Sequence, residues 1–225
     1  MGSNVKIKSK KKSRIFVVDD HQVLRQGLMQ LINHEDDLSA IGEAGTAKEA
    51  MEGIKIQKPD LVIIDIALEG TSGLELTKNL LDLHPKLLVL ILSMYDESTY
   101  MERILRVGAR GYLNKREACS HIILAIHKVL EGEIYMSDKW QERLMRRFVG
   151  SGKPVEASHA ASLSDRELEV LHFIGQGYAT RRVAEDLHVS VKTIESHYAN
   201  IKNKLDLQNS HELIGYAVKW CLSEK

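Results

Sequence analysis

The chain alternates short apolar runs with segments in which apolar residues recur every three or four positions, from about residue 14 to residue 131. Unbroken apolar runs of about four to eight residues favour buried β-strands, whereas the longer spacing favours amphipathic helices. We therefore predict strands at residues 15–18, 38–41, 61–64, 87–92 and 111–113. The helices predicted between and after them cover residues 22–33, 47–57, 73–83, 97–107 and 117–131.

This alternation predicts an α/β domain over residues 14–135, built on a parallel sheet with helices on both faces. In such sheets, ligands bind outside the carboxyl ends of the strands, at the point where the direction of winding reverses. The residues that follow each predicted strand are therefore the first candidates for a functional site.

The pattern changes after residue 135. Residues 136–162 contain one amphipathic segment, at residues 138–148, and then a stretch rich in glycine, serine and alanine, which is typical of a linker. Residues 163–225 show only helical spacing, and this predicts a small all-α domain with helices at 165–176, 180–187, 191–205 and 210–222. Residues 1–13 carry five lysines and little apolar content, which predicts a disordered basic tail.

Charge is distributed unevenly, although the 31 basic and 31 acidic side chains balance over the whole chain. Residues 14–136 hold 13 basic and 19 acidic side chains, an excess that favours a cation site or a basic partner. Residues 164–225 hold 8 basic and 9 acidic side chains, which argues against a nonspecific binder of nucleic acid.

Two further observations bear on the compartment. No apolar run approaches the roughly 18 residues of a membrane-spanning helix. Cys119 and Cys221 stand far apart and outside any metal-ligand spacing, as is usual in a reducing compartment. We therefore expect a cytoplasmic protein with no membrane partner.

Polar residues follow the predicted strands where a ligand would bind. Asp19 and Asp20 follow the first strand, Asp65 the third, Ser93 the fourth, and Lys115 lies just beyond the fifth. Taken singly, such residues are common as helix caps or strand ends. Together they would bring carboxylates, a hydroxyl and an ammonium group to one edge of the sheet. A divalent cation such as Mg²⁺ would relieve the repulsion between the carboxylates, and one carboxylate could then attack an electrophilic phosphorus atom.

These motifs resemble the receiver domain of two-component response regulators, over essentially all of residues 14–131. The resemblance rests on VVDDH at 17–21, DLVIIDIALEGTSGLEL at 60–76, LILS at 90–93 and GARGYLNK at 108–115. It implies a flavodoxin-like, doubly wound (βα)5 domain. It also implies Mg²⁺ as the cofactor and a sensor histidine kinase as the phosphodonor.

The resemblance assigns a role to each matching residue. Asp65 would be the phosphoacceptor. Mg²⁺ would be held by Asp20, Asp65 and the backbone carbonyl of Ala67, with Asp19 acting mainly through a metal-bound water. The side chains expected to contact or sense the phosphoryl group are Lys115, Ser93 and Tyr112, the last as an aromatic switch that turns inward once Ser93 moves.

One position departs from the family pattern. The family often has proline four residues after the phosphoacceptor, and this chain has Glu69 there. Gly70 and Gly73 are expected to keep the loop flexible, so the site need not be lost. The extra negative charge would alter the rate of phosphorylation or of hydrolysis.

Residues 163–218 carry the signals of a helix-turn-helix. Ser164 can cap the first helix, with Glu167 completing a capping box, and Gly177 can end that helix. Small Ala184 allows two helices to cross closely, and Ser190 can cap the helix at 191–205. The segment strongly resembles the DNA-binding domain of the NarL/FixJ (LuxR-type) regulators, and together with the receiver it indicates a response regulator of that family.

The resemblance implies that the helix at 191–205 enters the major groove of DNA. The residues expected on its base-facing side are Lys192, Glu195, Ser196 and Ala199. Candidates for phosphate contacts are Thr180, Arg181, Thr193, His197, Lys202 and Lys204. The alternative for this domain is a small helical bundle that binds protein. The apolar stripe of the last helix serves either dimer contacts on DNA or the core of the domain.

The expected function is a transcription regulator that accepts a phosphoryl group on Asp65 and then binds promoter DNA. A homodimer is expected on activation or on DNA, RNA polymerase is a candidate partner, and the only catalysis expected is the chain's own phosphorylation and dephosphorylation. Two other classes stay open: a receiver that acts as a protein-binding module without phosphorylation, and a metal-dependent phosphohydrolase. The sequence also leaves open whether the unphosphorylated receiver masks the recognition helix.

Overall fold

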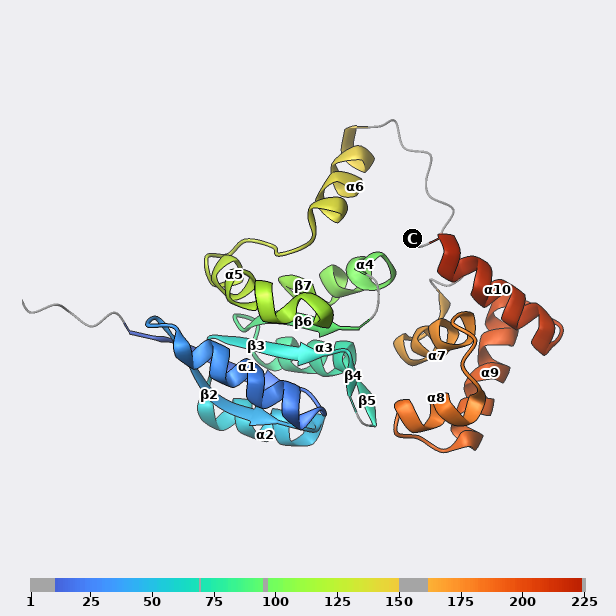
Figure 1. Ribbon diagram of the computed structural model, residues 1–225, viewed down its shortest axis with the longest axis horizontal. Helices are drawn as coiled ribbons and strands as arrows, with labels where there is room; N and C mark the ends of the chain where they lie inside the picture. Colours follow the sequence, from blue (N-terminus) through green and yellow to red (C-terminus); the bar gives the residue numbers. More distant parts are fainter. Residues whose placement is uncertain (1–10, 69, 95–96, 150–161, 224–225) are drawn as a thin grey trace, which may run out of the picture.

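The computed structural model describes residues 11–68, 70–94, 97–149 and 162–223. It shows an α/β domain beside a small helical domain, with one helix between them in the chain (Figure 1). Glu69, most of the predicted basic tail and residues 150–161 of the predicted linker lie outside the described residues.

Within the described residues, the sheet of the α/β domain has five parallel strands in the order β2-β1-β3-β6-β7. The winding reverses between the adjacent strands β1 and β3, and this is where a doubly wound sheet opens its ligand site. The strands are β1 (Ser13–Val18), β2 (Leu38–Ala44), β3 (Leu61–Asp65), β6 (Leu88–Ser93) and β7 (Gly111–Asn114).

Helices cover both faces of this sheet because successive side chains of a strand point to opposite sides. Ile15 and Val17 pack with α1 and α5 on one face, whereas Phe16 and Val18 pack with α2, α3 and α4 on the other (Figure 1). The helices are α1 (Gln22–His34), α2 (Ala47–Gln57), α3 (Gly73–Leu83), α4 (Glu97–Val107) and α5 (Ala118–Leu130). Two apolar layers therefore fix the sheet, and its carboxyl edge stays available for polar groups.

The predicted strands and helices are all present, with ends shifted by a few residues. The sequence pattern missed a small antiparallel hairpin made of β4 (Ala67–Leu68) and β5 (Thr71–Ser72), directly after β3. It also missed the 3-10 turn η1 (Lys115–Glu117), which includes Glu117, the residue at which the fifth helix was predicted to begin. Segments of two or three residues are too short to show any periodicity.

The second domain consists of helices α7 (Asp165–Gly175), α8 (Thr180–Asp186), α9 (Val191–Leu205) and α10 (Ser210–Ser223) in the part of the chain described. The predicted capping box is confirmed: Ser164 accepts a hydrogen bond from the N–H of Glu167, whose carboxylate accepts one from the N–H of Ser164. The Ser190 side chain likewise accepts the N–H of Thr193 at 3.0 Å. Gly177 follows α7 with φ +81°, the left-handed conformation that ends a helix.

Helix α6 (Asp138–Val149) confirms the helix expected at residues 138–148. Its start is tied to the α/β domain, because Ser137 donates from its backbone N–H to Glu97 at 2.9 Å and Trp140 is buried. Among the described helices, none is both long enough and apolar enough to cross a membrane.

Candidate functional site

The carboxyl edge of the sheet brings together the polar residues that follow its strands. Asp19 comes directly after β1 and is fully buried, and Asp65 ends the neighbouring strand β3 with 2% exposure. Lys115 follows the edge strand β7, and its Nζ lies 2.7 Å from Asp19 Oδ2 and 2.7 Å from Asp65 Oδ2. One ammonium group therefore bridges two buried carboxylates.

Burial sets the electrostatics of this cluster. It raises the pKa of Asp65 to about 7, while Lys115 opposes the shift and Asp19 adds to it. Burial also works against the charge of Lys115, but Asp65 and Asp19 raise its pKa above the ordinary value. The lysine thus stays cationic, and its single ammonium group faces the buried carboxyl groups of Asp19 and Asp65.

The cluster holds more carboxyl groups than cationic side chains, and this favours binding of a divalent cation. Asp19, Asp20, His21 and Asp65 each offer one ligand atom, and these atoms all lie within 4.8 Å of one another. Carboxylate oxygens are the ligands that Mg²⁺ prefers, usually one or two of them with waters and phosphate oxygens completing the shell. The donor set at this edge therefore suits Mg²⁺.

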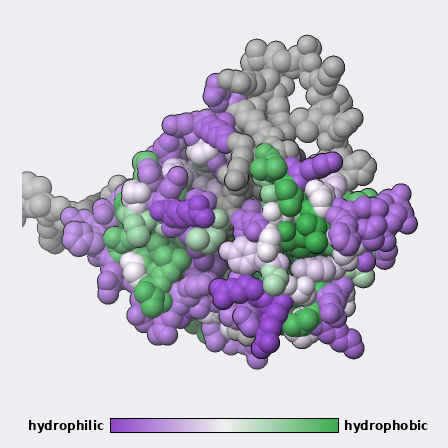
Figure 2. All heavy atoms as spheres, turned by 45° about the vertical axis from the view of Figure 1, so that its right-hand side comes forward, coloured by the Kyte–Doolittle hydropathy of each residue, from purple (hydrophilic) through white to green (hydrophobic). Residues whose placement is uncertain are grey.

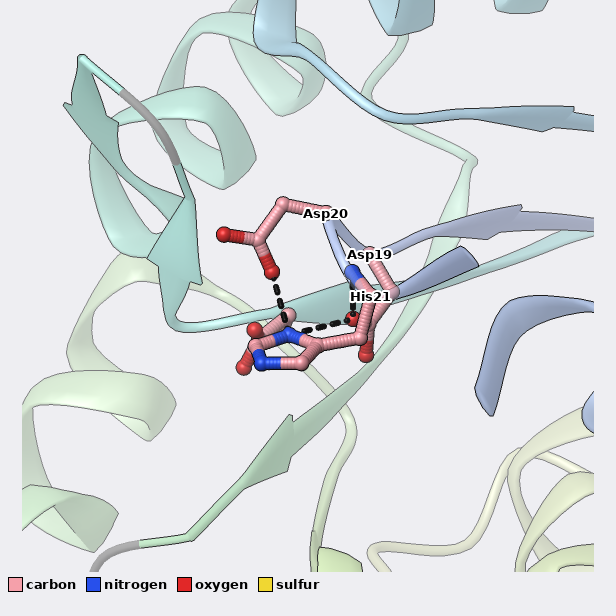
Figure 3. Close-up of side chains that lie close together, drawn as sticks. Asp19, Asp20 and His21 are labelled. Atoms are coloured by element: carbon pink, nitrogen blue, oxygen red, sulfur yellow. Dashed lines mark hydrogen bonds and ion pairs between the residues drawn. The ribbon is translucent and has the colours of Figure 1, made fainter. Parts of the chain in front are cut away.

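His21 is a member of the cluster that the sequence reasoning did not single out. Its Nδ1 lies 2.5 Å from Asp20 Oδ1 and 3.3 Å from Asp19 Oδ1. In Figure 3 dashed lines join the imidazole to the two carboxylates. The signal was its position directly after the aspartate pair, within VVDDH. Its imidazole is largely exposed, so it screens the two carboxylates from the solvent side.

Arg25 was also missed. From α1 it donates to the backbone carbonyl of Asp19 at 2.5 Å and to the carboxylate of Glu43 at 2.8 Å. Because Glu43 belongs to β2, the arginine ties the end of β1 to the neighbouring edge strand. It holds the backbone that carries the aspartate pair.

Two more predicted residues, Ser93 and Tyr112, lie on the strands β6 and β7, on the side of β3 away from β1. Ser93 ends β6 and is fully buried, opposite Asn114 in the strand register. Tyr112 is also buried, at 3% exposure, so its side chain occupies an inward position. Ala67 begins β4, two residues after Asp65.

The helical domain presents the predicted recognition helix, α9, with its base-facing residues open. Lys192, Glu195, Ser196 and Ala199 are all exposed. The other residues named for DNA contact are less uniform: Arg181 is exposed, whereas Thr180, Thr193, His197 and Lys202 are partly buried.

Neighbouring side chains change the charge that two of these candidates, Lys204 and His197, can offer to DNA. Lys204 donates from Nζ to the buried carboxylate of Glu167 at 2.7 Å, so part of its charge is already balanced. Burial, with a contribution from Arg166, lowers the pKa of His197 below its usual value. His197 is therefore uncharged at neutral pH and would act as a hydrogen-bonding group.

The apolar stripe of the last helix, α10, has a buried part and an exposed part. Leu213 and Ala217 are buried in the core, whereas Ile214, Val218 and Leu222 are 51%, 38% and 64% exposed. The exposed three are four residues apart, which places them on one side of α10. On the face of the molecule seen in Figure 2, several apolar patches interrupt the polar surface.

Residues 15–127 match the family described as response regulator receiver domain, and residues 161–217 match the family of bacterial regulatory proteins, luxR family. The chain belongs to the NarL/FixJ family of two-component response regulators. Its function is accordingly that of a transcription regulator activated by phosphorylation, and its domains are those of a regulator rather than of a typical enzyme.

Relatives match this response regulator over nearly its whole length. The oxygen regulatory protein NreC of Staphylococcus epidermidis (strain ATCC 12228 / FDA PCI 1200) is 36% identical over 94% of this chain and 99% of its own. NreC of Staphylococcus aureus (strain MRSA252) is 37% identical with the same coverage. Both domains and their order are therefore shared with these proteins.

Solved structures support the fold of the response regulator. A LuxR-family response regulator from Aurantimonas sp. SI85-9A1 is 28% identical, with a TM-score of 0.57, over 62% of this chain and all of that one. RcsB of Salmonella enterica serovar Typhimurium, bound to promoter P1flhDC with the phosphomimetic BeF3-, gives a TM-score of 0.60 at 21% identity, covering 92% of this chain and 98% of that one. The latter similarity concerns the fold alone.

Proposed function

We propose that Asp65 accepts the phosphoryl group from a phosphohistidine of a sensor histidine kinase. The observation that carries this proposal is the bridge of Lys115 to Asp19 and Asp65, 2.7 Å to each, at the point where the sheet reverses its winding. The carboxylate of Asp65 thus lies next to the ammonium group of Lys115 and next to the acidic pair Asp19 and Asp20, which suits a metal ion.

In the proposed transfer, an oxygen of Asp65 attacks phosphorus, the P–N bond to the histidine breaks, and an acyl phosphate forms. Asp20 and Asp65, with the carbonyl of Ala67, would hold Mg²⁺, and Asp19 would act through a metal-bound water. When bound, Mg²⁺ neutralises charge on the phosphoryl oxygens. Lys115, whose Nζ lies 2.7 Å from Asp65 Oδ2, would neutralise the remaining negative charge of the phosphoryl group.

The conformational change that follows phosphorylation is proposed to involve the buried residues next to Asp65. Ser93, at the end of β6, would donate its hydroxyl to a phosphoryl oxygen, which draws the β6–α4 connection inward. Tyr112 on the adjacent strand β7 would keep its buried position once that connection has moved. The surface of α4 and α5 would change as a result.

The output is proposed to be promoter binding by α9. Its exposed residues Lys192, Glu195, Ser196 and Ala199 would face the bases in the major groove. Among them, Glu195 can accept a hydrogen bond from a cytosine amino group. The phosphate contacts would come from Arg181, Thr193, His197, Lys202 and Lys204, and a homodimer would form through α10. RNA polymerase is a further proposed partner.

Phosphorylation of the purified protein tests the site. With Mg²⁺ and acetyl phosphate, or with a phosphorylated kinase, the chain should gain an acid-labile, hydroxylamine-sensitive phosphate. Asp65→Asn should abolish this label, and Asp82→Asn, a change at an exposed aspartate of α3, should leave it intact. Equal labelling of the Asp65→Asn variant would show that the phosphoacceptor is another residue.

Selection from a pool of random DNA sequences tests the output. Beryllofluoride and Mg²⁺ should enrich a defined motif, and Glu195→Ala should change that motif more than it changes the overall affinity. A motif that is the same for Glu195→Ala and for the unaltered protein would remove Glu195 from base recognition. The slope of affinity against salt, about −0.9 per neutralised phosphate on a double logarithmic scale, counts the phosphate contacts.

A further inference from the structure

The helical domain contacts the α/β domain at the acidic edge of the sheet. Asp165, the first residue of α7, accepts a hydrogen bond from Arg103 of α4, with 2.8 Å between Oδ1 and Nη1. Both side chains are mostly shielded, at 27% and 19% exposure. Helix α7 also contacts β5, part of the hairpin that follows Asp65, and the two lie side by side in Figure 1.

A second contact reaches the acidic cluster itself. His188, in the turn between α8 and α9, lies with its Nε2 3.5 Å from Oδ2 of Asp20. The carboxylate of Asp20 is only 11% exposed, with His21 at its other oxygen. A residue of the DNA-binding domain therefore lies against a proposed metal ligand of the receiver.

This contact leaves the recognition helix open. The base-facing residues of α9 are exposed while α7 and the α8–α9 turn are engaged. The contact between the domains therefore does not mask those residues. What it covers is the edge of the sheet at Asp20 and the hairpin after Asp65.

We propose that the DNA-binding domain closes the phosphorylation site, and that Asp165 and His188 hold it closed. The proposal rests on Asp65 as the phosphoacceptor and adds a residue from the other domain to its surroundings. In the closed state, a phosphodonor has restricted access to Asp65, and His188 competes with a cation for Asp20. Binding of Mg²⁺ therefore favours separation of the domains.

The charges on α7 explain why phosphorylation would also open the site. Glu169 is fully buried, and only one of its oxygens is paired, with Arg166 at 2.7 Å; the other accepts no hydrogen bond among the described residues. Burial raises its pKa to about 7, and the charge of Asp65 adds to the shift. Phosphorylation replaces the Asp65 carboxylate, which carries at most one negative charge, with a phosphoryl group that carries about two. These outweigh the roughly half positive charge of the α7 N-terminus, where Asp165 already stands.

The distance between the domains tests the closed state directly. Spin labels would be placed at Cys119, which is exposed, and at position 222 by Leu222→Cys in a Cys221→Ala background. Pulsed electron resonance on the full chain without Mg²⁺ should give one short, narrow distance. Arg103→Gln should lengthen and broaden it, whereas Arg106→Gln, at an exposed arginine of the same helix, should not. Restoration of the short distance by the exchanged pair Arg103→Asp with Asp165→Arg would assign it to this ion pair.

Two further measurements address access to the site. Acetyl phosphate should label Arg103→Gln roughly fivefold faster than the unaltered chain. Loss of a partly shielded ion pair costs about 1 kcal/mol, which would shift the equilibrium toward the open state by about that factor. His188→Ala should lower the Mg²⁺ concentration that opens the domains, with His211→Ala, at an exposed histidine of α10, as the control.

The docking proposal is overturned if Arg103→Gln and His188→Ala match their controls in distance and in labelling rate. Failure of the phosphoacceptor assignment looks different: Asp65→Asn would still be labelled, whatever the domain distance.

Discussion

Gly73 shows how little room surrounds Asp65, the proposed phosphoacceptor. A Cβ at this position would lie 2.0 Å from the backbone oxygen of Asp65 and 2.9 Å from the Cα of Ile66. The N–H of Gly73 also donates to the carbonyl of Ile66 at 2.7 Å. The sequence suggested that Gly73 makes the loop flexible, but its role in the structure is to let two backbone segments pack closely.

Gly73→Ala should therefore destabilise the receiver by about 3 kcal/mol, because the added methyl group meets backbone atoms that cannot rotate away. Urea unfolding followed by circular dichroism measures the change, and labelling by acetyl phosphate should fall with it. Gly27→Ala is the matched control: this glycine lies inside α1 with nothing within 4 Å, so alanine should stabilise the helix by up to about 1 kcal/mol. Equal stability of the two variants would contradict the close approach at Gly73.

Glu167 is the buried residue that ties α7 to α9. Burial opposes its ionisation, but hydrogen bonds from Lys204 and Ser164 lower its pKa below the ordinary 4.5. Its charged form is thus stabilised in the folded state. The stabilisation is present above about pH 4.5 and is lost as pH falls through the lower pKa of the folded state.

Glu167→Gln should lower the stability of the helical domain by about 1 kcal/mol at pH 7, and this difference should shrink below pH 4.5. In a Trp140→Phe background, Trp220 is the remaining tryptophan and reports unfolding of that domain by fluorescence. Glu185→Gln, at an exposed glutamate of α8, should change stability by less than about 0.5 kcal/mol at either pH. A pH-independent effect of Glu167→Gln would rule out the charge as its cause.

At the scale of elements, the helix-turn-helix depends on where α9 begins. Ser190 accepts the N–H of Thr193 at 3.0 Å, and this cap starts the helix directly after the turn that carries His188. The cap thus fixes the direction of α9 relative to α8 as well as satisfying a backbone group.

Ser190→Ala should cost about 1 kcal/mol of stability in the helical domain, since the capping hydrogen bond is lost. Thermal unfolding followed by Trp220 fluorescence, again in the Trp140→Phe background, measures it. Ser196→Ala is the comparison, because Ser196 lies inside α9 and its hydroxyl donates to the carbonyl of Lys192 in the preceding turn. Alanine there should leave stability unchanged or slightly raised; a loss as large as that of Ser190→Ala would argue against the cap.

Elements with strong periodicity were predictable from the sequence, and with them the site residues that follow the strands. Asp19, Asp65 and Lys115 could be found because parallel strands point their carboxyl ends the same way. The β4–β5 hairpin could not, because strands of two residues have no pattern. The pairing of Arg103 with Asp165 had no local signal either: the two are far apart in sequence, on different domains, and each is ordinary on a helix surface.

At the scale of the whole molecule, the helical domain contacts the receiver through one surface and leaves another, apolar surface exposed. Helix α7 and the α8–α9 turn engage the receiver, whereas the outer side of α10 keeps its apolar residues exposed. Dimer formation through α10 is therefore compatible with the closed state as well as with the open one.

Val218→Glu should lower affinity for DNA with two half-sites by about tenfold, because a charge would be buried in the proposed dimer contact through α10. Affinity for a single half-site should not change. Electrophoretic mobility shifts on the two DNAs separate these effects. Met145→Glu, the same change in charge at an exposed position of α6, controls for repulsion from DNA. Equal losses on both DNAs would place the effect outside dimerisation.

The pairing of Lys204 with Glu167 has a consequence for how the protein finds its promoters. A chromosome offers about a million or more wrong sites, which attract a regulator mainly through their phosphates. A cation already engaged by a buried carboxylate adds little to that attraction. The regulator should consequently dwell only briefly on random DNA, and a larger share of its copies should remain in solution, where a kinase can reach them.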